Sequence, residues 1–94
     1  MIHWTGPARN QLNQAYEHIA SAKSEEVSAR IVAQIISSVQ QLDSFPMLGR
    51  PGRVRGTREL VIANTPYLAA YEIQKARINI LALYHGAQQW PEVF

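Results

Sequence analysis

Four arginines crowd into one short segment of this 94-residue chain and are the first candidates for chemistry. Their guanidinium groups are planar, permanently charged donors that match phosphate oxygens. The glycines among them let the backbone turn sharply and approach a partner closely. The segment could therefore bind RNA, DNA or an acidic protein segment, or it could be a solvated basic loop that keeps the protein soluble. The arginines are Arg50, Arg53, Arg55 and Arg58, and the glycines are Gly49, Gly52 and Gly56.

Two features of the sequence argue against binding of single-stranded nucleic acid and against nucleotide hydrolysis. No aromatic residue lies among the arginines, whereas proteins that bind single strands stack the bases on aromatic rings. The sequence also has no glycine-lysine phosphate loop after a predicted strand, so nucleotide hydrolysis is not expected.

Proton transfer has two candidate residues. His85 follows the apolar run of the last predicted strand and could be a general acid or base near neutral pH; the alternative is a structural histidine bonded to the backbone at the strand end. Glu59 could act as a base beside Arg58, but adjacent strand residues point to opposite faces, so the two share a site only if the strand is bulged. The three histidines and the acids show no metal-ligand spacing. We therefore expect neither a metal nor a cofactor.

Length and composition restrict the class of protein. A chain of 94 residues with 47% hydrophobic residues is expected to form one domain, residues 1–94. The absence of cysteine excludes disulfides and thiolate metal sites and fits a reducing cytoplasm. The start of the chain does not resemble a signal peptide, and the apolar stretches are too short to span a bilayer. Net charge is only +2, so the positive field is local to the arginines.

Two helices are predicted in the first half of the chain. Apolar residues recur at helical spacing from Ala8 to Ile19 and again from Val27 to Leu42. Pro7 suits the first turn of the first helix, and Ser24 is the expected N-cap of the second. The corner at Phe45 and Pro46 is expected to anchor the end of the second helix.

After the arginines the apolar period changes from 3.6 to 2, which indicates strands. With a short strand at Met1 to Trp4, the predicted order is β-α-α-β-β-β. The simplest architecture is an α+β fold in which the two N-terminal helices pack on one face of a small antiparallel sheet. Alternation predicts that Ile78, Ile80, Ala82 and Tyr84 line one face of the last strand, and that Leu81, Leu83 and His85 line the other.

Four motifs, in this order and spacing, resemble the RelE/ParE superfamily of bacterial type II toxins. They are LDSFPMLGRPG, GTRELVI, PYLAAYEI and INILALYHGAQQWP, and with the helices they extend the resemblance over nearly the whole chain. The resemblance implies an α+β fold with two helices against an antiparallel sheet. It also implies neutralisation by a cognate antitoxin whose C-terminal segment wraps the toxin.

The superfamily has two functional branches, and one position favours the second. RelE-like members are ribosome-dependent enzymes that cleave mRNA, whereas ParE-like members bind and inhibit DNA gyrase. RelE-like enzymes usually carry an arginine on the middle strand, where this chain has Leu68. An apolar side chain cannot stabilise a charged phosphorane. The resemblance therefore favours a ParE-like binding inhibitor over an enzyme, with the RelE-like endoribonuclease as the alternative.

The two branches assign roles to particular residues. His85 is catalytic only under the RelE-like alternative. Under either branch the four arginines and Trp90 are expected to contact the target or the antitoxin; Trp90 could instead pack over the end of the sheet. A third hypothesis is a toxin fold that has lost its activity and works only with its antitoxin.

Overall fold

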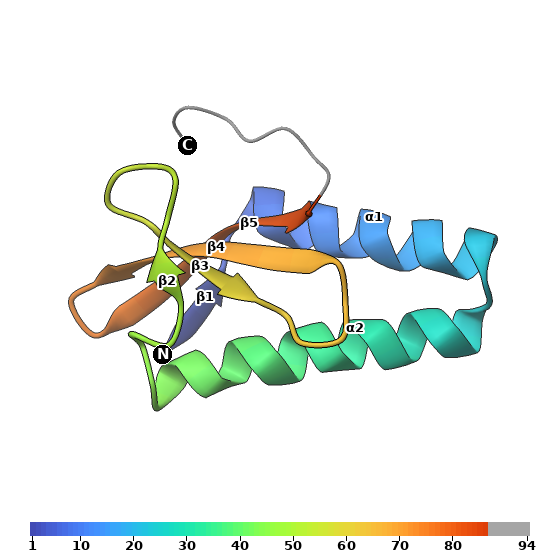
Figure 1. Ribbon diagram of the computed structural model, residues 1–94, viewed down its shortest axis with the longest axis horizontal. Helices are drawn as coiled ribbons and strands as arrows, with labels where there is room; N and C mark the ends of the chain where they lie inside the picture. The colour runs from blue at the N-terminus through green and yellow to red at the C-terminus, as the bar shows by residue number, and fades with distance from the viewer. Residues whose placement is uncertain (87–94) are drawn as a thin grey trace.

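The computed structural model describes residues 1–86, which form two long helices, one short 3-10 helix and a five-stranded sheet (Figure 1). The two long helices lie side by side as an antiparallel hairpin. The strands lie in the order β1-β5-β4-β3-β2 across the sheet. Along the chain the elements are β1 (Ile2–Trp4), α1 (Gly6–Ala22), α2 (Glu25–Gln40), η1 (Gln41–Asp43), β2 (Arg50–Pro51), β3 (Arg58–Val61), β4 (Tyr67–Gln74) and β5 (Arg77–His85).

The predicted α+β fold is confirmed, but the sheet differs from the prediction in the direction of one strand pair and in one additional strand. β1 pairs with β5 in parallel, with Ile2 opposite Ile78, whereas the other strand pairs are antiparallel. The two-residue strand β2 was not predicted, because two residues are too short to show an alternating pattern. It places Arg50 opposite Glu59 at the edge of the sheet.

Both long helices begin at side chains that cap them. Thr5 precedes α1 and accepts from the backbone N–H of Ala8, and Pro7 lies in the first turn. Ser24 precedes α2 and accepts a hydrogen bond of 3.1 Å from the backbone N–H of Val27. Such caps satisfy backbone donors that a helix start leaves unpaired, so the polar residues fix where each helix begins.

The prediction that Phe45 and Pro46 anchor the end of α2 is wrong for Phe45. The side chain of Phe45 is exposed, with 65% of its surface accessible. Leu42, within η1, is fully buried and belongs to the main core at this end of α2. Pro46 does contribute, because its carbonyl accepts a hydrogen bond of 2.8 Å from the hydroxyl of Tyr71 on β4.

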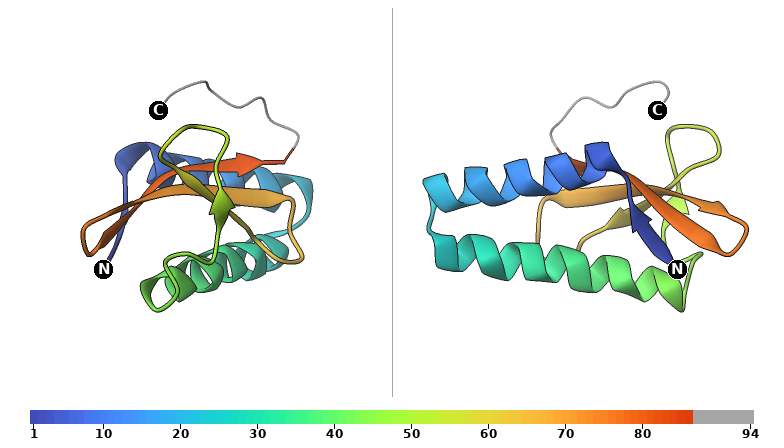
Figure 2. Two further views of the ribbon diagram at one scale, coloured as in Figure 1. Left: turned by 60° about the vertical axis from the view of Figure 1, so that its left-hand side comes forward. Right: turned by 180° about the vertical axis from the view of Figure 1, so that it is seen from behind.

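The main core lies between the helix hairpin and one face of the sheet. Ile35 and Val39 of α2 are fully buried, and so are Ala69 and Tyr71 of β4. A second, smaller cluster on the opposite face contains Ala70, Ala82 and Tyr84. The segment between β2 and β3 extends away from α2 in the two views of Figure 2.

The predicted alternation of β5 is wrong in its second half. Ile78 and Ile80 face the helices as one group, but Leu83 joins them there, whereas Ala82 and Tyr84 face the other side. The cause is a register shift: Ala70 pairs with Ala82, and Tyr71 pairs with Ile80, so Leu81 is an extra residue. A β-bulge of this kind reverses the faces of all the residues that follow it.

Thr5 is expected to stabilise the junction of β1, α1 and β5. Its hydroxyl donates a hydrogen bond of 2.8 Å to the carbonyl of Ile80, and the same oxygen caps α1. Replacing Thr5 by alanine removes both contacts, and we expect the free energy of unfolding to fall by about 1–2 kcal/mol in urea titrations. Ser21→Ala, at an exposed position of α1, is the control and is expected to change it by less than about 0.5 kcal/mol. Equal effects of the two changes would contradict this role of Thr5.

Candidate functional site at the arginine loop

The four arginines lie on a tight hairpin between β2 and β3, here called the arginine loop (residues 49–58). Its two strands pair Arg50 with Glu59 and Pro51 with Arg58. The loop closes through a hydrogen bond of 2.8 Å from the N–H of Gly52 to the carbonyl of Thr57. Gly56 has a φ of +83°, a conformation that residues with a Cβ rarely adopt. The glycine-rich sequence therefore encodes a defined turn.

Glu59 lies beneath this loop and organises it. Only 2% of its surface is accessible, yet both carboxylate oxygens have partners. Oε1 accepts from Nε of Arg50 at 3.3 Å and from Nη2 at 3.1 Å. Oε2 accepts from the backbone N–H of Arg53 at 2.8 Å, and Nε of Arg53 lies 3.7 Å from it. A buried carboxylate is tolerated when its oxygens are bonded in this way.

Arg58 points to the helix side of the sheet and has a structural role. Its Nε donates a hydrogen bond of 2.9 Å to the carbonyl of Gly49, and its Nη2 donates one of 3.3 Å to the carbonyl of Met47. The hydroxyl of Tyr71 accepts a hydrogen bond of 2.9 Å from the N–H of Gly49. A Cβ at Gly49 would lie 2.7 Å from the Tyr71 ring and from the backbone carbonyl of Glu59. The start of the loop is therefore packed without spare space.

The four arginines consequently differ in what they offer a partner. The side chains of Arg50 and Arg53 keep 54% and 52% of their surface accessible although both face Glu59. Arg55, near the tip, is exposed and has no hydrogen bond or ion pair within residues 1–86. With Glu59 included, four positive charges and one negative charge leave the loop a net charge of +3.

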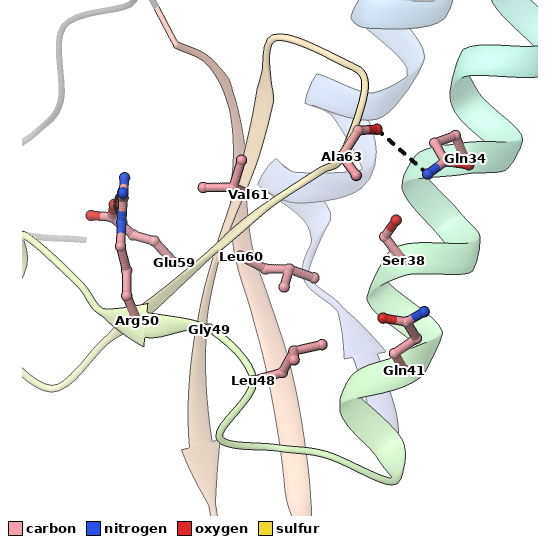
Figure 3. A pocket seen from close by; sticks show the side chains of 10 residues that line it. All are labelled: Gln34, Ser38, Gln41, Leu48, Gly49, Arg50, Glu59, Leu60, Val61 and Ala63. Atoms are coloured by element: carbon pink, nitrogen blue, oxygen red, sulfur yellow. Dashed lines mark hydrogen bonds and ion pairs between the residues drawn. The ribbon is translucent and has the colours of Figure 1, made fainter.

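An open groove of about 410 Å³ separates the loop from α2 (Figure 3). Gln34 and Ser38 of α2 and Gln41 of η1 form one wall. On β3, Leu60 points toward α2, whereas Glu59 and Val61 point to the other side, where Arg50 lies. The prediction that neighbouring residues of β3 face opposite sides of the sheet is therefore confirmed.

His85 lies far from the arginines. It ends β5 opposite Tyr67, and the two rings pack edge to face with centroids 5.6 Å apart. Arg58 lies opposite Tyr71, four residues further along β4, which corresponds to about 13 Å. His85 also lines a pocket of about 230 Å³ with His18 on the helix side, whereas Glu59 faces the other side. The two candidates for proton transfer are not brought together.

The tyrosines near these residues supply no base at neutral pH. Burial raises the pKa of the Tyr67 phenol above its ordinary value, and burial does the same for Tyr84. Both phenols therefore stay protonated. Tyr84 is buried in the small cluster on the face away from the helices.

Trp90, one of the residues predicted to contact a partner, lies outside the described residues. Among residues 1–86, no group of three or more histidine, cysteine, aspartate or glutamate side chains could hold a metal ion. None of the helices in that range has the length and apolar character needed to cross a membrane.

Sequence reasoning missed two residues that shape the loop. Glu59 was considered only as a base, and no role in the loop was expected for Tyr71. Glu59 could have been suspected from its type, since it is the one acid in the stretch from Phe45 to Ile62. The contacts of the Tyr71 hydroxyl gave no signal, because the partners lie 22 and 25 residues earlier in the chain.

Comparisons with known proteins agree with this fold and these motifs. The sequence model of the family described as "ParE toxin of type II toxin-antitoxin system, parDE" matches residues 2–90. A relative from Sinorhizobium fredii (strain NBRC 101917 / NGR234), described as "Putative toxin Y4kP", is 40% identical over 92 residues, covering 98% of this chain and 94% of the relative. A solved structure described as "Chromosomal ParDE TA system from P. aeruginosa" is similar with a TM-score of 0.83 and 27% identity, covering 89% of this chain and 92% of that chain. The chain therefore belongs to the ParE toxin family of type II toxin–antitoxin systems.

Proposed function

We propose that this protein is a toxin that arrests growth by binding and inhibiting DNA gyrase in the cytoplasm, as a single toxin domain of residues 1–94. A cognate antitoxin neutralises it through a segment that wraps the toxin. Membership of the ParE family supports the choice of gyrase. The similar Pseudomonas structure, described as a ParDE toxin–antitoxin system, supports the choice of an antitoxin partner.

One observation carries the choice of a binding inhibitor over a nuclease. Cleavage of RNA by its own 2′-OH needs a base, a cation and an acid around one phosphate. Within the described part of the chain, His85 pairs with Tyr67, four residues along β4 from Tyr71, the partner of Arg58, which corresponds to about 13 Å. Glu59 faces away from the helices, whereas His85 lines a pocket on the helix side. Leu68, at the position where RelE-like enzymes carry an arginine, is apolar and 7% accessible.

The arginine loop is the surface we assign to the target. Arg55 is exposed near its tip, and Arg50 and Arg53 each keep about half of their surface accessible. Guanidinium groups that are still partly hydrated can form charge-assisted hydrogen bonds with carboxylates of a protein partner. Arg58 is left out of this contact, because its Nε and Nη2 donate to the backbone carbonyls of Gly49 and Met47 and its side chain is only partly exposed.

The first test is pulse labelling after induction of the toxin in cells that lack the antitoxin. We expect thymidine incorporation to fall within minutes and before methionine incorporation, because inhibited gyrase stops replication first. Purified toxin is then expected to block supercoiling of relaxed plasmid by gyrase. His85→Ala is expected to arrest growth as well as the unmodified protein.

The same experiment identifies the outcomes that contradict the proposal. An earlier fall of methionine incorporation, abolished by His85→Ala, would show a translation inhibitor of the RelE type. Unchanged growth on induction would indicate a toxin fold without toxic activity. Arg55→Ala is the variant that tests the arginine loop itself. Arg55 has no hydrogen bond or ion pair within the described chain, so its loss is not expected to disturb the fold.

A further inference from the structure

Glu59 makes contacts that would not be required if the only role of the arginine loop were to keep the protein soluble. Its carboxylate is almost completely buried, and it binds the side chain of Arg50 and the main chain of Arg53. Burying a carboxylate is unfavourable unless bonds replace its hydration, whereas exposed arginines are well hydrated without a partner. A loop whose only role is solubility would therefore not need an acid at this position to keep its arginines in water.

The contact to Arg53 fixes the backbone rather than only a side chain. The N–H of Arg53 donates to Oε2 of Glu59 at 2.8 Å. Immediately after it, Val54 is buried, and its carbonyl accepts hydrogen bonds from both the N–H and the hydroxyl of Thr57. Arg55 lies inside this closed turn, between Val54 and Gly56. Its exposed side chain is thus presented from a backbone that Glu59 holds in one conformation.

We infer that Glu59 is a positioning residue for the arginine loop, and that target recognition depends on the loop conformation it holds and not on positive charge alone. The inference rests on the proposed function, in which the loop contacts a protein target. A fixed loop loses little conformational freedom on binding, so its guanidinium groups can meet several acceptors at once.

Replacing Glu59 by glutamine separates the two explanations, because they predict opposite signs. Glu59→Gln removes one negative charge, so the net charge of the chain rises from +2 to +3. If charge alone drove binding, this change would strengthen it. If Glu59 positions the loop, the change weakens binding, because the amide cannot pair with two guanidinium groups.

The matched control is Glu17→Gln. Glu17 is an exposed residue of α1 with no hydrogen bond or ion pair in residues 1–86, and its replacement raises the net charge by the same amount. Both variants of the full chain are compared with the unmodified protein by limited trypsin digestion after Arg53 and Arg55, and by inhibition of gyrase supercoiling at several salt concentrations. Circular dichroism at the same temperature checks that each variant is folded.

We expect Glu59→Gln to be cut in the loop about tenfold faster than Glu17→Gln, because local opening controls cleavage. We expect it to need about tenfold more protein for half-inhibition. Its inhibition is also expected to depend less steeply on salt, because fewer ionic contacts form together. A variant that was only partly unfolded would need more protein by the same factor at every salt concentration, so the salt dependence separates the two causes.

The inference is overturned if Glu59→Gln inhibits gyrase as well as Glu17→Gln does, or if trypsin cuts its loop no faster. If the unmodified protein does not inhibit gyrase, the proposed function fails. Growth arrest in cells and the rates of trypsin cleavage then decide whether Glu59 positions the loop. Equal growth arrest by Glu59→Gln and Glu17→Gln would count against this positioning role. Weaker arrest by Glu59→Gln, together with faster cleavage of its loop, would support it.

Discussion

Replacing Tyr71 by alanine is expected to lower the free energy of unfolding by about 3–5 kcal/mol, the range for truncating a large aromatic residue in a core. Tyr71 is fully buried in the centre of β4 between the helix hairpin and the start of the arginine loop. A domain of this size has about 5–15 kcal/mol in total, so the variant is expected to be close to unfolding at 37 °C. Urea titration followed by circular dichroism measures the change.

The control for this prediction is Tyr16→Ala. Tyr16 lies on α1 and keeps 37% of its surface accessible, so its truncation leaves a much smaller cavity. We expect a loss of less than about 1.5 kcal/mol. A comparable loss for both tyrosines would show that the burial of Tyr71 is not what stabilises the fold.

Tyr71→Phe separates the hydroxyl from the ring. The hydroxyl donates to the carbonyl of Pro46 at 2.8 Å and accepts from the N–H of Gly49 at 2.9 Å. Phenylalanine fills the same space but leaves these two groups without their partner, and we expect it to cost about 1–3 kcal/mol. Gly49 is then held by Arg58 without the hydrogen bond from its N–H to Tyr71, so trypsin is expected to cut the loop faster as well.

The sequence was sufficient to predict the helices because their signals are local. Thr5 and Ser24 cap the helices that follow them, and the apolar spacing of 3.6 residues marks the buried sides. The strand β4 was equally predictable, since Tyr67, Ala69 and Tyr71 alternate and lie on the helix side. The order of the predicted elements followed from these periodicities, the family motifs agreed with it, and the comparisons confirm the fold.

The features that could not be predicted depend on contacts between distant residues. The extra residue Leu81 changes the faces of β5 only because of how β5 pairs with β4. The parallel pairing of β1 depends on where α1 and α2 return the chain. The pairing of Glu59 with Arg50 depends on the loop folding back over β3, and residue types alone do not determine such a register.

The candidate site was therefore predicted in location but not in organisation. The pattern of arginines and glycines indicated a basic loop before a strand, and the structure places such a loop there. It did not indicate that Arg58 bonds within the loop, that Arg50 and Arg53 face a buried acid, or that Arg55 alone of the four has no partner within residues 1–86. The contact of these residues with a target stays a prediction.

Removing both arginines that face Glu59 is expected to destabilise the protein more than removing Arg55. In the double variant Arg50→Ala/Arg53→Ala the carboxylate of Glu59 keeps one backbone hydrogen bond and loses both guanidinium groups. Breaking a fully buried ion pair costs about 3–5 kcal/mol; the two arginines are half exposed, so we expect about 2–3 kcal/mol here. Arg55→Ala is expected to stay within about 0.5 kcal/mol of the unmodified protein.

Adding Glu59→Gln to the double variant tests whether the uncompensated charge is the cause. The amide carries no charge and its oxygen can still accept from the N–H of Arg53, so the triple variant is expected to recover at least about half of the lost stability. No recovery would mean that the aliphatic parts of the arginine side chains, packed over the loop, stabilise the fold instead. Recovery of stability without recovery of gyrase inhibition would separate the two roles of these residues: Glu59 requires the arginines in order to be buried, and the target requires the arrangement that this burial produces.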